Sequence, residues 1–168
     1  LMSGRTIGVG VISLGWMGRL HSRGYRGIKE RFPGLDVDVQ LVSACDPVEA
    51  TREAAVKELG FRRAVVDYRD VINDPEVDVV SICSPNFLHR EVALAAAAAG
   101  KPFWIEKPMG VSAGQSRDIA QAAAAAGVVT SVGFNYRHTP ALEKAREIIR
   151  EGRIGRLYNV RCWLIADY

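Results

Sequence analysis

The chain has 168 residues, 48% of them hydrophobic and 24% charged, which suits one globular domain and is too few for two ordinary ones. Its net charge of +3 comes from basic and acidic residues mixed along the sequence, which argues against a nucleic-acid partner. No apolar run is long enough to span a bilayer and no secretory signal opens the sequence, so we expect a cytoplasmic protein without a membrane partner. Cys45, Cys83 and Cys162 lie far apart in apolar runs, which predicts buried reduced thiols and no metal site.

Apolar runs alternate with helical patterns along the first part of the chain. Residues 6–12 and 39–45 are apolar and rich in β-branched side chains, which predicts two buried strands. A helix is predicted over residues 16–32 between them. Pro47 at a first helical position opens a second helix over residues 48–59, which Gly60 closes.

The same alternation continues to about residue 151. The signals predict strands at residues 62–66, 77–83, 103–105 and 128–133, and helices at residues 86–99, 112–126 and 139–151. Asn86 is the expected N-cap of the first of these helices. Ser112 and Gln115 form a capping box before the second, and Thr139 with Pro140 begins the third.

Strands that alternate with helices predict βαβ units and a doubly wound parallel α/β sheet, the Rossmann fold. From Tyr158 to Ala166 every second residue is apolar, which predicts a further, half-buried strand. A lone terminal strand is not stable, so we expect it to be the first strand of an antiparallel α+β domain that the chain lacks. Pairing with an edge of the first sheet is the alternative. The predicted organisation is a Rossmann domain over residues 5–138, then a linking helix and the start of a truncated second domain over residues 139–168.

The turn after the first strand carries a glycine pattern typical of dinucleotide binding. Gly15 and Gly18 occupy its second and third glycine positions, while Ser13 stands where the first glycine is usual. Ser13 either strains the turn or adds a hydrogen-bonding group. The helix N-terminus would offer amide donors to a pyrophosphate. The candidate cofactor-binding residues here are Ser13, Leu14, Gly15, Trp16 and Met17. An ordinary glycine turn between strand and helix is the alternative.

Asp46 follows the second strand. An acidic residue at this place can accept hydrogen bonds from both ribose hydroxyls of the adenosine, which favours NAD over NADP as the cofactor. NADP stays possible, because Asp46 before Pro47 is also a good helix N-cap.

Three short motifs follow the later strands in a fixed order. Residues 84–89 read SPNFLH, residues 106–108 read EKP, and residues 133–137 read GFNYR. In this order and at strand ends, the set resembles the glucose–fructose oxidoreductase and inositol dehydrogenase family, Gfo/Idh/MocA, over essentially the whole chain.

The resemblance implies an NAD(P)-dependent oxidoreductase that acts on a sugar, inositol or related polyol. It places Lys107 beside the substrate hydroxyl and the nicotinamide, Glu106 near the nicotinamide ribose, and Pro108 after a cis peptide bond. The further residues that it implies are Ser84, Pro85, Asn86, His89 and Asn135 on the cofactor side and Arg137 on the substrate side. The family usually forms homo-oligomers through its C-terminal sheet. Its usual acid/base pair, an aspartate and a histidine, lies in the C-terminal domain and has no match here.

Lys107 is the candidate catalytic residue. A lysine accepts the hydroxyl proton only where burial or a nearby cation favours the neutral amine, and Glu106 would oppose this, so Lys107 can instead polarise the oxygen as a cation. A surface lysine in a turn is the plainer reading. The three histidines, His21, His89 and His138, are more often structural than catalytic at such positions.

Two other functions fit the same residues. One is a Rossmann module that senses or binds a nucleotide without chemistry, which the serine at position 13 favours and Lys107 opposes. The other is a structural dimerisation domain, in which Gly15 and Gly18 serve only packing. Substitution of Lys107 separates an enzyme from a sensor, and nucleotide affinity separates both from a structural domain.

Overall fold

A six-stranded parallel sheet forms the centre of a first compact unit, which ends at Gly133. The computed structural model describes residues 4–163 and residue 165. The strand order is β3-β2-β1-β4-β5-β6, so the predicted doubly wound α/β architecture is confirmed. The strands are β1 (Arg5–Ile12), β2 (Val37–Cys45), β3 (Arg63–Val65), β4 (Val79–Ile82), β5 (Phe103–Ile105) and β6 (Thr130–Val132).

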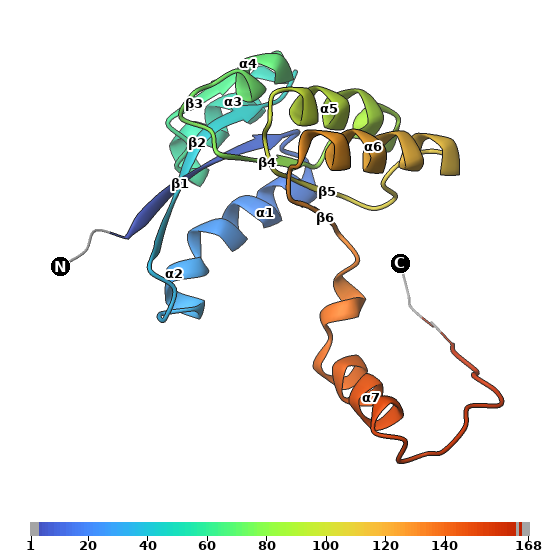
Figure 1. Cartoon of the computed structure of the whole chain (residues 1–168). Coiled ribbons are helices and arrows are strands. Elements are labelled where there is room, and N and C mark those ends of the chain that lie inside the picture. Colours follow the sequence, from blue (N-terminus) through green and yellow to red (C-terminus); the bar gives the residue numbers. More distant parts are fainter. Residues whose placement is uncertain (1–3, 164, 166–168) are drawn as a thin grey trace. The chain divides into compact units, whose positions relative to one another are not determined.

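Helices connect the strands and cover both faces of the sheet. In the first unit they are α1 (Trp16–Arg26), α2 (Ile28–Arg31), α3 (Glu49–Ala54), the π-helix η1 (Ala55–Leu59), α4 (Tyr68–Ile72), α5 (Asn86–Ala98) and α6 (Ala113–Ala126). Figure 1 shows α4, α5 and α6 on one face and α1 on the other. The alanine-rich helices α5 and α6 run side by side, because small side chains let helix backbones approach closely.

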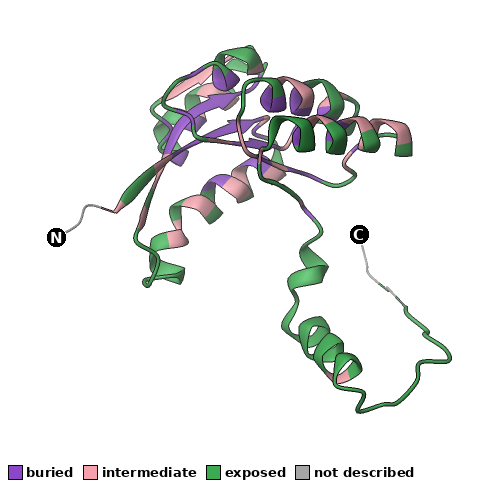
Figure 2. Ribbon diagram, in the orientation of Figure 1, coloured by how far each residue is buried: buried purple, intermediate pink, exposed green. Residues whose placement is uncertain are grey.

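Each face of the sheet buries its own apolar cluster. Figure 2 shows the buried residues along the strands and in helices α1, α5 and α6. Under α4, α5 and α6 lie strand residues such as Val80, Ile82 and Ile105, all at most 1% exposed. Under α1 and η1 lie Val9 and Val11 of β1, packed with apolar residues of β2 and η1. Burial of one such side chain stabilises the fold by about 1.5–3 kcal/mol.

The strand register brings the carboxyl ends of the central strands to one edge of the sheet. Ile12 pairs with Cys45 on β2 and with Ile82 on β4, and Ile82 pairs with Ile105 on β5. The residues that follow these pairs therefore lie along one edge. The order reverses between β1 and β4, which is where open α/β sheets bind ligands.

Several predicted helix boundaries were wrong. The helix expected over residues 16–32 divides at Gly27, whose N–H donates to the carbonyls of Arg23 and Gly24, because glycine interrupts a helix easily. The helix expected from residue 48 begins at Glu49 with Val48 as its N-cap, so Pro47 precedes the helix. Pro85 rather than Asn86 is the N-cap of α5, and Asn86 is its first residue.

Two further differences concern local hydrogen bonds. Ser112 Oγ accepts the N–H of Gln115 at 3.2 Å as predicted, but Gln115 Oε1 accepts the N–H of Val111 instead of closing a capping box. Helix α4 was not predicted. It has only five residues, and its N-cap Asp67 accepts the N–H of Arg69 through its side chain.

The second compact unit begins at Phe134. It contains the 3-10 helix η2 (Asn135–His138) and helix α7 (Pro140–Arg150), with Thr139 as N-cap and Pro140 in the first turn as predicted. The predicted strand from Tyr158 does not form: residues 158–163 have no regular structure and are exposed, since a strand needs a partner for its backbone hydrogen bonds. Leu164 and Ala166 of this prediction lie outside the described residues. Of the three cysteines expected to be buried, Cys45 is buried, Cys83 is half-buried and Cys162 is exposed.

Candidate functional site

The turn between β1 and α1 has the backbone that the glycine pattern requires, with serine in place of one glycine. Ser13 has a φ of +70°, in the left-handed region that L side chains rarely adopt. Its N–H donates to the carbonyl of Cys45 at 2.8 Å, which fastens the turn to the end of β2. Residue 13 thus has the left-handed backbone conformation that the first glycine of the pattern usually adopts, and for serine this conformation is strained.

The two glycines of this turn serve different purposes. A Cβ on Gly18 would collide with the carbonyl oxygen of Ser13, so Gly18 allows α1 to pack closely on the strand, as expected. A Cβ on Gly15 would meet nothing within 4 Å. Gly15 is the N-cap of α1, and no side chain of the described residues caps the helix. The first-turn amides of α1 therefore have no side-chain acceptor there and carry the partial positive charge of the helix N-terminus.

The other candidates of this turn differ in exposure. Leu14 is 1% exposed and belongs to the core, and its N–H donates to Asp46, so its part in the turn is structural. Trp16 is 76% exposed, and Met17 is half-buried.

Asp46 joins the first two turns at the edge of the sheet. Its Oδ2 accepts the N–H of Leu14 at 2.9 Å and its Oδ1 accepts the N–H of Val48 at 3.0 Å. Its carbonyl accepts a hydrogen bond from Arg52 at 2.9 Å. Asp46 is 6% exposed and is not the N-cap of α3, which is Val48. The carboxylate is fixed in place beside the open end of α1.

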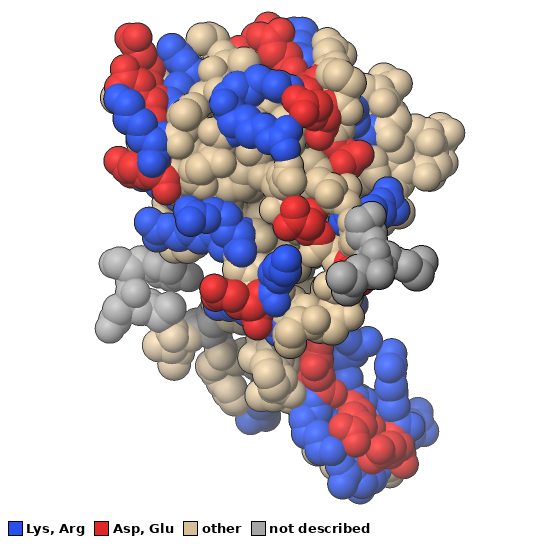
Figure 3. Space-filling model, turned by 90° about the vertical axis from the view of Figure 1, so that its left-hand side faces the viewer, with Lys and Arg blue, Asp and Glu red and all other residues tan. Residues whose placement is uncertain are grey.

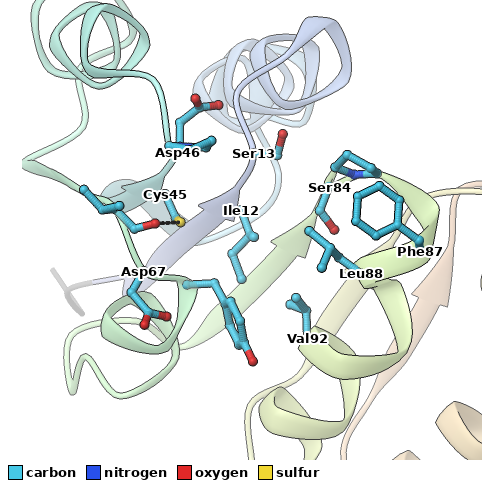
Figure 4. Close-up of a pocket in the computed structure, with 13 residues that line it drawn as sticks. Ile12, Ser13, Cys45, Asp46, Asp67, Ser84, Phe87, Leu88 and Val92 are labelled. Carbon is cyan, nitrogen blue, oxygen red and sulfur yellow. Dashed lines mark hydrogen bonds between the residues drawn. The ribbon is translucent and has the colours of Figure 1, made fainter.

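A cavity of about 530 Å³ opens beside Asp46 and Ser13. Figure 4 shows Asp46 and Ser13 on one side of it and Ser84, Phe87 and Leu88 on the other. It is lined by Ile12, Ser13, Cys45, Asp46, Pro47, Val66, Asp67, Tyr68, Ser84, Pro85, Phe87, Leu88 and Val92. The candidates Ser13, Asp46, Ser84 and Pro85 thus share one cavity, although they come from three strand ends.

Two polar features of the cavity were not predicted. Asp67 and Tyr68 line it because α4 begins there, and this short helix gave no clear sequence signal. A hydrogen bond from the backbone N–H of Arg69 lowers the pKa of Asp67. Burial raises the pKa of Tyr68 to about 12, and the Tyr68 hydroxyl donates a hydrogen bond to Glu91. Ser84 Oγ is buried and has no hydrogen-bond partner within the part of the chain that the structure describes.

His89 lies beneath the turn that follows β4. It is 1% exposed, its Nε2 lies 2.8 Å from the carbonyl oxygen of Ser84, and its Nδ1 lies 2.8 Å from that of Pro108. Asn86 is exposed at the start of α5. The resemblance groups both with the cofactor site, but the ring of His89 is committed to two backbone carbonyls.

Glu106 at the end of β5 faces α1. Its Oε1 lies 3.0 Å from His21 Nε2 and 3.4 Å from Trp104 Nε1, and His21 Nδ1 lies 2.6 Å from Ser81 Oγ. A Cβ on Gly133 would lie 2.6 Å from Glu106 Oε1, so glycine leaves the room that the carboxylate needs. Sequence reasoning missed this buried His21–Glu106 pair, because residues 85 positions apart give no joint signal.

Lys107 follows Glu106 at the same edge of the sheet. Its side chain is exposed, and its peptide bond to Pro108 is cis, as the resemblance implied. Asn135 and Arg137 lie in η2 of the second unit, where Asn135 Oδ1 accepts the N–H of Tyr136 at 3.0 Å. Among the described residues, no group of three or more His, Cys, Asp or Glu side chains could hold a metal ion, and no helix is long and apolar enough to cross a membrane.

Comparison with known proteins gives a consistent picture. Residues 7–134 match a family described as "Oxidoreductase family, NAD-binding Rossmann fold". The chain is 38% identical to levoglucosan dehydrogenase of Pseudarthrobacter phenanthrenivorans over 165 residues, 98% of this chain and 42% of that protein. It is 32% identical to the NAD⁺-dependent scyllo-inositol 2-dehydrogenase of Bacillus subtilis over 146 residues, 87% of this chain and 41% of that protein.

Solved structures agree with these sequence matches. An NAD-binding oxidoreductase from Klebsiella pneumoniae superposes with a TM-score of 0.84 at 43% identity, over 89% of this chain and 40% of that one. Levoglucosan dehydrogenase in complex with NADH and levoglucosan superposes with a TM-score of 0.86 at 36% identity, over 90% of this chain and 41% of that one. The chain thus spans about two fifths of the length of these relatives. It belongs to the Gfo/Idh/MocA oxidoreductase family, and the part of the family that it contains is the NAD-binding Rossmann domain.

Proposed function

We propose that the whole protein is an NAD-dependent dehydrogenase that transfers a hydride between the nicotinamide and a carbinol carbon of a sugar or polyol. The observation that carries this proposal is the junction of three features at one sheet edge: the uncapped N-terminus of α1, the fixed carboxylate of Asp46, and the cavity beside them. The relatives that act on levoglucosan and scyllo-inositol support the substrate class.

The residues present fit NAD. The amides of Trp16 and Met17 would bind the pyrophosphate, because they lie in the first turn of α1, which no side chain caps. The carboxylate of Asp46 would accept hydrogen bonds from the hydroxyls of the adenosine ribose and repel the extra phosphate of NADP. The apolar walls of the cavity suit the adenine, and the unpartnered Ser84 Oγ suits a polar group of the cofactor. When bound, NAD supplies the hydride acceptor.

Lys107 is the proposed catalytic residue, and it would hold the substrate hydroxyl. Its exposed side chain forms no ion pair within the described residues, and its neighbour Glu106 is occupied by His21. A free ammonium group can stabilise the negative charge that develops on the alcohol oxygen as the hydroxyl proton leaves, and this charge is used to form the carbonyl as the hydride passes to NAD. The proton would pass to the acid/base pair that the resemblance places in the C-terminal domain of the family. Arg137 is proposed for the substrate, and Asn86 and Asn135 for the cofactor.

We propose the same division of the chain as the sequence predicts: an NAD-binding domain over residues 5–138, and a linking helix with the start of a substrate and oligomerisation domain over residues 139–168. For the whole protein we also propose that it is a cytoplasmic homo-oligomer and that it binds no nucleic acid. Figure 3 supports the last point for the face it shows, where Lys and Arg are interspersed with Asp and Glu.

The test uses the whole protein and its Lys107→Met variant. Calorimetric titration with NADH and with NADPH should give micromolar binding of NADH and weaker binding of NADPH in both proteins, since Asp46 is unchanged. Reduction of NAD with levoglucosan, scyllo-inositol and other polyols should fall about 1,000-fold in the variant, at the scale of a lost catalytic group. Binding without turnover in the wild type would leave a nucleotide-binding module, and tighter binding of NADPH would overturn the role of Asp46.

A further inference from the structure

The hydrogen-bond partners of the His89 ring are unusual, because both of them are acceptors. Both ring nitrogens lie 2.8 Å from backbone carbonyl oxygens, those of Ser84 and Pro108. A carbonyl oxygen only accepts hydrogen bonds, and a neutral imidazole has one N–H. In the neutral form, one nitrogen lone pair would face a carbonyl lone pair in a site that is 1% exposed to water. Two N–H groups, as in the imidazolium, satisfy both carbonyls with charge-assisted hydrogen bonds.

His21 is the instructive contrast within the same domain. Its partners are Ser81 Oγ at 2.6 Å and Glu106 Oε1 at 3.0 Å. A serine hydroxyl both donates and accepts, so a neutral His21 can donate from Nε2 to Glu106 and accept from Ser81 at Nδ1. The partners of His21 therefore do not require a second ring proton, whereas those of His89 do.

The two carbonyls that His89 contacts belong to the two turns that matter most for the site. Ser84 follows β4 and lines the cavity, and Pro108 directly follows Lys107. The residue on the other side of Lys107, Glu106, is held by His21 from α1 and confined by Gly133. The backbone around Lys107 is thus anchored through both of its neighbours, while its own side chain stays exposed.

We propose that His89 is a positioning residue: it donates from both ring nitrogens and so fixes the turn that carries Lys107 relative to the turn that lines the cofactor cavity. The role in catalysis rests on the proposed dehydrogenase function, while the two donated hydrogen bonds do not. The reason for such a device is geometric, since a displacement of about 1 Å between reacting groups can cost about 100-fold in rate.

The first experiment measures the ring protons of His89 directly. The whole protein is labelled with ¹⁵N-histidine, and the protons on the ring nitrogens are observed by NMR at neutral pH. His89 should show two protonated nitrogens, and the His89→Gln variant assigns its signals by their loss. A single protonated nitrogen on His89 would overturn the proposal, whether or not the protein proves to be a dehydrogenase.

The second experiment separates positioning from folding. His89→Gln keeps a side-chain donor for one carbonyl, and His89→Leu keeps none. We expect kcat to fall about tenfold in the first and about 100-fold in the second, by more than the affinity for NADH falls. The control is Ile119→Ala, which removes a buried side chain of α6 that belongs to neither turn and should lower stability while keeping kcat.

The outcomes are distinct. A kcat within twofold of wild type in both folded His89 variants would overturn the positioning role, and so would an equal loss in Ile119→Ala. If the wild type bound no NADH at all, the proposed function would fail, and the NMR result would still decide whether His89 donates to both carbonyls.

Discussion

The two compact units of the chain differ in how far their sequence patterns correspond to regular structure. In the first unit, alternating strand and helix signals gave six strands and covering helices around two buried clusters. In the second, the capping and proline signals gave helix α7, while the period-two pattern from Tyr158 gave no strand over residues 158–163. The difference follows from which residues pair in the backbone hydrogen bonds of each kind of element. A helix satisfies its backbone within a few residues, whereas a strand depends on a neighbour elsewhere in the chain.

The comparison also explains how the site is organised. Asp46, Ser84 and Lys107 are each found from local motifs, but they come to one edge of the sheet only because β2, β4 and β5 end in register with their neighbours. Asn135 and Arg137 lie in the second unit, in a short 3-10 helix that is exposed throughout. Four measurements test this description of the two units.

The largest expected effect is in thiol reactivity. Cys45 is buried in the first unit and its thiol donates to the carbonyl of Val66 at 3.2 Å, whereas Cys162 in the second unit is exposed. In the 168-residue chain, Cys162 should be alkylated more than about 1,000-fold faster than Cys45, because Cys45 reacts only from opened molecules. Mass spectrometry of labelled peptides measures both rates, and in strong denaturant the two should converge. Similar rates without denaturant would contradict the buried assignment of Cys45.

Two thiols of the first unit, those of Cys45 and Cys83, make its stability depend on alkaline pH. Burial, reinforced by the charge of Asp46, raises the pKa of Cys45 from 9.0 to about 12, and burial raises that of Cys83 equally. Between these values the unfolded chain has lost the protons that the folded chain keeps. The free energy of unfolding should therefore fall as pH rises from about 9 to about 12, and show no contribution from these thiols below that range.

The next effect is on stability. Ile82 on β4 is 0% exposed, while Ile149 on α7 is 42% exposed. Ile82→Ala should lower the free energy of unfolding by about 3 kcal/mol, since it removes buried contacts and leaves a cavity. Ile149→Ala should change it by less than about 0.5 kcal/mol. Urea unfolding of the two variants measures both, and a comparable loss in Ile149→Ala would mean that α7 is packed in solution.

The smallest effect concerns the strained turn. At the left-handed Ser13, glycine would relieve about 1–2 kcal/mol of backbone strain and add about 0.5–1 kcal/mol of unfolded-state entropy. Ser13→Gly should therefore raise stability by about 0.5 kcal/mol. The matched control is Ser116→Gly within α6, which should lower stability by a similar amount. A loss of stability in Ser13→Gly would show that the serine side chain contributes to the turn.

The sequence alone determined the alternation of strands and helices, the parallel doubly wound sheet and the glycine turn, because each of these depends on local periodicity and capping. It also placed Asp46, Ser84 and Lys107 at strand ends, where their chemistry is useful. It failed where a contact joins distant residues: Glu106 faces His21, His89 holds two backbone carbonyls, and Asp67 reaches the cavity through an unpredicted helix. Only the tertiary structure decided these partners, because the hydrogen-bonding groups of a buried side chain are satisfied by whichever elements the fold packs against it.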